Sequence, residues 1–197
     1  MEFAVIIAAY LVGSIPSGLV LGKLSGLDVR KSGSGNIGAT NVGRLLGKKM
    51  GFLTLVCDVG KAVLPMLLAA RLLPPSDQRD LVVIFCGAAA FLGHLFPLYL
   101  KFHGGKGVAT ALGIFLYLSP PAAVIDMLIF IAVVYNWGYV SLGSLSAALL
   151  MPGIVWLLTR SPAMTLLAVF VGVLIWIKHH ENIRRLLNNE EKTWKKR

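Results

Sequence analysis

Long apolar runs, separated by shorter polar segments, divide the chain. The runs cover residues 3–24, 51–73, 81–100, 108–118, 122–136, 145–158 and 164–178. A helix needs about 20 mostly apolar residues to cross the hydrocarbon core of a bilayer, and shorter helices occur within bundles. Pro120-Pro121 and Ser161-Pro162 fall between runs, where tight external turns are expected. The pattern predicts an all-α, polytopic integral membrane protein with about seven transmembrane helices, or about five if the short helices are re-entrant.

The composition supports a membrane location. The chain of 197 residues is 56% hydrophobic and 14% charged, whereas soluble domains are typically about 45–50% apolar and about 25% charged. A soluble fold of this length could not bury so much apolar surface, so we expect one membrane-embedded domain over residues 1–197. Cys57 and Cys86 lie singly within apolar runs, without metal-ligand spacing, and they predict neither a metal site nor a redox site.

The distribution of Lys and Arg predicts the orientation in the membrane. With the N-terminus outside, 15 basic residues fall on inner segments and 3 on outer segments, the bias expected of cytoplasmic loops. The inner residues are Lys23, Arg30, Lys31, Arg44, Lys48, Lys49, Lys101, Lys106, Lys178, Arg184, Arg185, Lys192, Lys195, Lys196 and Arg197, and the outer residues are Arg71, Arg79 and Arg160. We therefore predict an outside N-terminus and a cytoplasmic C-terminus.

This topology gathers the unusual polar segments, 25–50, 101–107, 137–144 and the tail from Lys178, on the cytoplasmic face. The net charge of +10 would indicate nucleic acid in a soluble protein. On the inner side of a membrane protein it suits anionic lipid head groups and anionic substrates. We expect membrane lipid as a partner, no nucleic acid, and one site on this face.

The first inner segment reads Lys31-Ser-Gly-Ser-Gly-Asn-Ile-Gly-Ala-Thr-Asn-Val-Gly-Arg44. Glycines that alternate with Ser and Asn favour turn conformations whose backbone N–H groups can surround phosphate oxygens. Arg44, Lys48 and Lys49 would supply positive charge nearby. The alternative is a flexible cytoplasmic loop, but such linkers seldom contain two Asn, a Thr and an Arg so close together.

The second inner segment contains Gly104-Gly105-Lys106-Gly107, directly before an apolar helix. The N-terminus of that helix would face the inner side and offer N–H groups to an anion, with Lys106 as the counter-charge. The alternative is a connector that simply needs glycines. The segment Gly18-Leu-Val-Leu-Gly22-Lys23 lacks the spacing of a P-loop and is not a candidate.

Charged and polar residues near or within the runs give weaker signals. Asp58 and Lys61 share one helix face within the second run, either as an internal ion pair or as a wall of a substrate cavity. Residues His179, Asn182 and Arg185 would form a polar stripe at a helix end. None of the four histidines precedes Asp at the spacing common in thioester-dependent acyltransferases, and no GxSxG motif occurs.

Five segments in order resemble the bacterial PlsY family of membrane acyl-phosphate:glycerol-3-phosphate acyltransferases. They are Gly13-Ser-Ile-Pro-Ser-Gly18, Gly33-Ser-Gly-Asn-Ile-Gly-Ala-Thr-Asn41, Gly104-Gly-Lys-Gly-Val-Ala-Thr110, Val140-Ser-Leu-Gly-Ser144 and His179-His-Glu-Asn-Ile-Arg-Arg-Leu186. The resemblance runs nearly end to end. Its second and third segments are the most specific.

The resemblance implies which residues act. The catalytic candidates are Ser34, Asn36, Lys106, His179 and Asn182, and the phosphate-binding candidates are Gly33, Gly35, Thr40, Asn41, Arg44, Gly104, Gly105, Gly107 and Ser141. Two positions depart from the family pattern. The residue before Gly104 is often Lys in the family but is His103 here, and the residue after His179 is often Arg but is His180.

The resemblance also implies the reaction and its location. The family transfers an acyl group from acyl phosphate to the 1-hydroxyl of glycerol 3-phosphate, the first step of phospholipid synthesis. The site would face the cytoplasm from the bacterial cytoplasmic (inner) membrane, with no cofactor or metal, and a soluble enzyme that makes acyl phosphate is a candidate partner. Because acyl phosphate has a good leaving group, we expect substrate assistance without an essential protein base. The alternatives are a phosphate-ester transporter and a non-catalytic lipid-binding module.

The predicted sidedness can be tested by labelling. Single cysteines placed in segments 25–50, 101–107 and 137–144, with Cys57 and Cys86 replaced, should react with an impermeant reagent only after the membrane is permeabilised, because positive-inside loops are cytoplasmic. Labelling of the 25–50 segment from outside intact cells would contradict the topology.

Overall fold

The computed structural model describes residues 1–194, and in that part of the chain the regular elements are all helices, which confirms the all-α prediction. Lys195, Lys196 and Arg197, counted above among the inner basic residues, lie outside the described residues. The chain forms two compact units, Met1–Tyr117 and Leu118–Arg197. The prediction of one domain over 1–197 stays a prediction.

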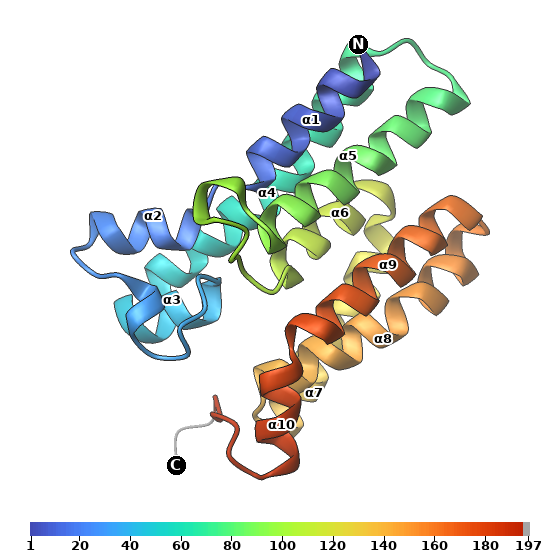
Figure 1. The fold of residues 1–197 in the computed structure, drawn as a ribbon. Coiled ribbons are helices and arrows are strands. Elements are labelled where there is room, and N and C mark those ends of the chain that lie inside the picture. The colour runs from blue at the N-terminus through green and yellow to red at the C-terminus, as the bar shows by residue number, and fades with distance from the viewer. Residues whose placement is uncertain (195–197) are drawn as a thin grey trace. The chain divides into compact units, whose positions relative to one another are not determined.

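The N-terminal unit is built around three long helices. Helices α1, α4 and α5 pack against one another, and α2, α3 and a short 3-10 helix, η1, gather beside the start of α4 (Figure 1). A side chain at Gly113 would collide with the carbonyl of Val59, so α6 approaches α4 closely. The elements are α1 (Glu2–Gly13), α2 (Ser17–Leu24), η1 (Val29–Lys31), α3 (Ala39–Leu46), α4 (Lys48–Leu72), α5 (Asp77–Leu95), η2 (Leu98–Leu100) and α6 (Val108–Leu118).

The C-terminal unit is a hairpin-connected set of helices. Its elements are α7 (Pro120–Trp137), α8 (Val140–Thr159), α9 (Pro162–Lys178) and α10 (His180–Leu187). Helix α8 packs against both α7 and α9, and α10 contacts α8 and α9. Pro120 and Pro162 occupy the first turns of their helices, where a missing N–H does no harm, so both predicted proline turns are confirmed.

All seven predicted apolar runs fall on helices. Five stretches are long and apolar enough to cross a membrane, and the bent pair α9–α10, with an angle of 60°, would make a sixth. Helix α6, with 11 residues, is shorter than a usual span. Large apolar side chains face outward, for example Leu128 (58% exposed) and Leu157 (67% exposed), as lipid contact requires. The number of crossings and their sidedness stay predictions.

The run 3–24 matches the candidate span Glu2–Leu24, although the chain breaks there into α1 and α2 at Pro16, whose nitrogen cannot donate to the helix. Two other predictions need correction. Segment 25–50 is not one loop, since it contains η1 and α3 and the first residues of α4. Segment 137–144 is mostly helix: α8 begins at Val140, and the hydroxyl of Ser144 is satisfied within it by the carbonyl of Val140 at 3.0 Å.

A small apolar core fixes the first inner segment. The core consists of four buried side chains: Leu19 of α2, Val29 of η1, Ile37 just before α3, and Val42 of α3. Leu45, Leu46, Met50 and Leu100 pack against this core. This core holds the polar residues between η1 and α3 at both ends, so the segment is not a flexible linker.

Candidate active site

The segment between η1 and α3, residues 32–38, is here named the serine–glycine loop. Gly33 and Gly35 have φ angles of 67° and 71°, a left-handed conformation that side chains rarely tolerate. The N–H of Gly35 donates to the carbonyl of Ser32 at 3.1 Å. The loop is thus a series of tight turns, as its glycine spacing predicts.

Asn41 holds this loop together from within. Its side chain is 1% exposed. Its Oδ1 accepts the N–H of Ser34 at 2.9 Å, and its Nδ2 donates to the carbonyls of Val29 (3.0 Å), Ser32 (3.2 Å) and Asn36 (2.9 Å). A side-chain amide has one acceptor and one donor group, and both are engaged by the backbone of the loop.

This arrangement changes which groups of the loop face a ligand. The N–H groups of Ser34 and Gly35, which the sequence suggested as phosphate donors, already bond within the loop. The Ser34 side chain is exposed, Asn36 is half-buried, and Thr40 and Arg44 follow one turn apart on α3. The geometry favours side chains over backbone amides as the ligand-binding groups here, and it gives Asn41 a supporting position.

Residues 104–107, here named the glycine loop, are fixed to the end of α5. The N–H groups of Gly104 and Gly105 donate to the carbonyls of Leu95 (3.1 Å) and His94 (3.0 Å). A side chain at Gly105 would collide with the imidazole of His94, so close approach explains this glycine. Lys106 is half-buried.

The glycine loop leads into the N-terminus of α6. The first N–H groups of a helix lack partners within it and favour anions. The Thr110 hydroxyl in this first turn is fully buried, and among the described residues it has no hydrogen-bond partner. A buried polar group without a partner is costly, and a bound anion at this end of α6 would supply one.

The charged residues within α4 form an ion pair. Lys61 Nζ lies 3.0 Å from Asp58 Oδ1, and the two side chains are 5% and 2% exposed. The same Nζ donates to the carbonyl of Ile15 at 3.2 Å, at the break between α1 and α2. The internal ion pair considered from the sequence is therefore present, while a role as a cavity wall is untested.

In the C-terminal unit, His179 sits at the bend between α9 and α10. Its side chain is 3% exposed, and its Nδ1 lies 2.8 Å from the carbonyl of Ile175. Because a carbonyl only accepts, Nδ1 carries the proton, and in a neutral ring Nε2 is then an acceptor. The bend interrupts the predicted polar stripe after its first member.

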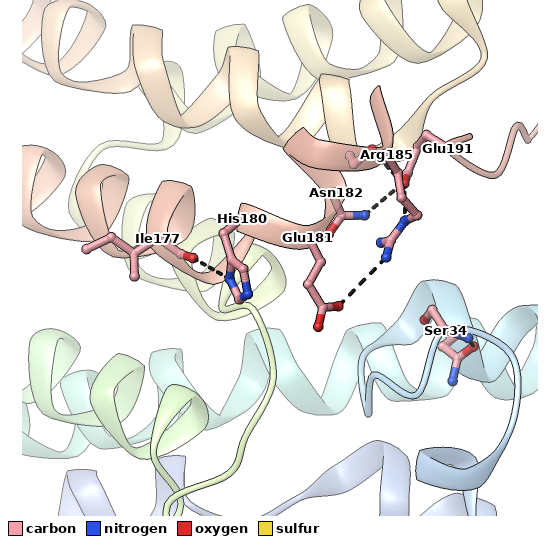
Figure 2. A network of polar contacts seen from close by, with 9 residues as sticks. Ser34, Ile177, His180, Glu181, Asn182, Arg185 and Glu191 are labelled. Atoms are coloured by element: carbon pink, nitrogen blue, oxygen red, sulfur yellow. Dashed lines mark hydrogen bonds and ion pairs between the residues drawn. The ribbon is translucent and has the colours of Figure 1, made fainter. Parts of the chain in front are cut away.

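Ser141 and Asn182 converge on one carboxylate in the tail. Glu191 accepts from Ser141 Oγ at 2.8 Å, Asn182 Nδ2 at 2.7 Å and Arg185 Nε at 2.7 Å. Figure 2 shows Asn182 and Arg185 pointing at Glu191, with Glu181 on the other side of Arg185 at 3.7 Å. Burial opposes the charge of Glu191, but the hydrogen bonds from Arg185, Asn182 and Ser141 outweigh it and hold its pKa below the ordinary value.

Comparison with known proteins identifies the family. The model of the family described as "Glycerol-3-phosphate acyltransferase" matches residues 3–189. The chain belongs to this family. The glycerol-3-phosphate acyltransferase of Desulfotalea psychrophila is 55% identical over 197 residues, with 100% of both chains covered. That of Syntrophotalea carbinolica is 50% identical over 194 residues, covering 98% of this chain and 97% of its own.

Solved structures give the same result. The chain is similar to PlsY (YgiH), an integral membrane glycerol 3-phosphate acyltransferase, in its glycerol 3-phosphate form, with a TM-score of 0.92 and 39% identity over 98% of this chain and 96% of that chain. The lysophosphatidic acid form gives a TM-score of 0.89 at 39% identity, covering 98% and 94%. The predictions of the family, of an acyltransferase and of an integral membrane fold are confirmed.

Three residues of the glycerol-3-phosphate acyltransferase fold that sequence reasoning missed are now visible. His94 supports the glycine loop, and Glu191 holds Ser141 and Asn182, and no sequence motif connects either residue to its partners. Thr110 ends the segment Gly104-Gly-Lys-Gly-Val-Ala-Thr110, but the burial of its hydroxyl could not be predicted from the sequence. The assignments of the individual catalytic and phosphate-binding residues stay predictions.

The support given by Asn41 leads to a test. Asn41→Asp replaces the donating amide by an oxygen that faces three carbonyls, so buried donors are lost and like dipoles meet. We expect destabilisation of about 1–3 kcal/mol and faster tryptic cleavage after the exposed Lys31. Asn188→Asp, at an exposed position, is the matched control. Unchanged melting and cleavage in Asn41→Asp would contradict the supporting role.

Proposed function

We propose that this chain transfers an acyl group from acyl phosphate to the 1-hydroxyl of glycerol 3-phosphate, giving lysophosphatidic acid and inorganic phosphate. The observation that supports it most is the close similarity to a glycerol 3-phosphate acyltransferase solved with glycerol 3-phosphate and with lysophosphatidic acid. The reaction would take place at the cytoplasmic face of the bacterial inner membrane, where the basic segments are predicted to lie.

The proposed roles follow from the chemistry of the residues. Both substrates carry phosphate. Arg44 lies on α3, which follows the serine–glycine loop, and Lys106 lies in the glycine loop. Charge-assisted hydrogen bonds from Arg and Lys are the strong contacts available to phosphate. Ser34 and Asn36 would bind polar substrate oxygens from the serine–glycine loop, and the α6 N-terminus would add its N–H groups.

All bonds and protons of the transfer are accounted for without a protein base. The 1-hydroxyl oxygen attacks the carbonyl carbon of acyl phosphate and forms the ester bond. The bond between that carbon and the phosphate oxygen breaks, and the phosphate leaves with the electron pair and accepts the hydroxyl proton. The protein then contributes position and electrostatic stabilisation of the developing oxyanion.

Two carboxylates outside the membrane helices, Asp28 and Glu191, are poor candidates for a general base. A general base works best with a pKa near the operating pH. Hydrogen bonds from Arg30 hold the pKa of Asp28 well below its ordinary value, and the pKa of Glu191 is also lowered. Both groups stay ionised and engaged near neutral pH, and they are weak bases.

The reaction can be tested with purified protein in detergent micelles. Phosphate release should require palmitoyl phosphate and glycerol 3-phosphate together, and palmitoyl-CoA should not replace the donor. Lys106→Ala should lose well over tenfold in kcat/KM, as loss of a charge-assisted contact of about 1.5–3 kcal/mol predicts. Lys101→Ala, at an exposed position before the glycine loop, is the matched control. Substrate binding without phosphate release would instead favour a transporter.

The role of His179 separates orientation from base catalysis. His179→Ala should raise KM for glycerol 3-phosphate more than it lowers kcat, because we expect the ring to orient the acceptor. His180→Ala, at the exposed neighbour, should remain near wild type. A thousandfold loss of kcat in His179→Ala at unchanged KM, with a wild-type ionisation near pH 6.5 that the variant lacks, would make His179 the base.

A further inference from the structure

A third ionisable residue joins the buried ion pair of the N-terminal unit. His94, at the end of α5, has its Nδ1 3.8 Å from Asp58 Oδ1, and its side chain is 4% exposed. Together with Lys61, these side chains form a charged cluster inside a part of the protein whose helices can span a membrane. Ionisable groups there are costly and are retained for a functional reason.

Each basic residue of the cluster contacts a place where helical backbone is interrupted. Lys61 donates to the carbonyl of Ile15, in the break between α1 and α2. His94 is next to the end of α5, where its own carbonyl and that of Leu95 accept the N–H groups of the glycine loop. Irregular backbone at membrane depth must be satisfied by the protein itself. The Lys61 side chain thus satisfies the first break, and the His94 imidazole packs against Gly105 at the second.

The imidazole of His94 lies between Asp58 and the glycine loop. Its Nδ1 is directed to the Asp58 carboxylate, and its Nε2 is the atom nearest to where a side chain at Gly105 would be. Asp58 is in turn held by Lys61 at 3.0 Å. One ring thus lies between the Asp58 carboxylate and the backbone of the glycine loop.

We propose that Asp58, Lys61 and His94 form a positioning centre for the glycine loop, fixing the backbone that carries Lys106 and leads into the α6 N-terminus, without touching the substrate. The inference rests on the phosphate-binding role proposed for that loop. The three are positioning residues, and the cations of the loops remain the phosphate ligands.

His94→Leu tests the proposal, because it keeps the backbone carbonyl and an apolar body but removes the ring nitrogens. We expect KM for glycerol 3-phosphate to rise about tenfold, with a smaller change in kcat. His94→Asn keeps a donor near the position of Nδ1 and should recover part of that loss. A folded His94→Leu protein with wild-type KM and kcat would overturn the proposal.

A second readout does not depend on activity. Tryptic cleavage after Lys106 should accelerate about tenfold in His94→Leu relative to cleavage after Lys31, because the glycine loop opens more often. If wild-type protein shows no acyl transfer, the proposed function fails, while this cleavage ratio still tests the positioning centre. An unchanged ratio in the folded variant contradicts it.

The double variant Asp58→Asn/Lys61→Met covers the case in which His94→Leu does not fold. It removes both charges together, so no buried charge is left unpaired. We expect melting closer to wild type than in Asp58→Asn alone, but with the raised KM and the faster cleavage after Lys106. Asp126→Asn, which neutralises a buried carboxyl of α7, is the matched control. Wild-type KM and cleavage in the double variant would limit the ion pair to a structural role.

Discussion

The buried carboxylate of Asp58 is the interaction on which the N-terminal unit depends. Two candidate spans of this unit contain a break in the helix, one at Pro16 and one after Leu95. A bilayer offers no water to the backbone groups that such breaks release. Lys61 donates to the carbonyl of Ile15 at the first break, and Asp58 pairs with Lys61 at 3.0 Å. The imidazole of His94 packs against Gly105 near the second break. Pairing with Asp58 makes the burial of Lys61 tolerable, so Lys61 can satisfy the backbone at the first break.

The serine–glycine loop and the glycine loop are held in place by different contacts, and in both the result is an ordered backbone. Asn41 fills the serine–glycine loop with a side-chain amide that bonds to four backbone groups. The glycine loop instead lies directly on the end of α5, where absent side chains permit contact with His94. In both loops the polar backbone is ordered before any ligand arrives. Preorganised dipoles are what electrostatic stabilisation of a transition state requires, because they need not reorganise during the reaction.

The sequence predicted what depends on local pattern. Hydrophobic runs located every long helix, and Pro120 and Pro162 marked helix starts. Patterns could not reveal contacts that depend on folding: the bonds of Asn41 to the loop have no sequence motif, and Glu191 lay in a tail without any motif. A phosphate contact of Asn41 stays a prediction. The end of α7 was placed well but the start of α8 was not, because serines that bond within a helix look polar in a hydropathy profile.

The histidines show why positioning is the better description of this protein's chemistry. An imidazole base is usually oriented by a carboxylate on its second nitrogen. In His103, His179 and His180 the Nδ1 faces a backbone carbonyl instead, at 2.7, 2.8 and 3.1 Å. A neutral carbonyl fixes the tautomer but stabilises the imidazolium less than an ionised carboxylate would. Among the described residues His94 is the histidine beside a carboxylate, and its ring is buried under the glycine loop. The one histidine with a nearby carboxylate in the described part of the chain therefore lies against backbone, which agrees with the proposal that no protein base is needed.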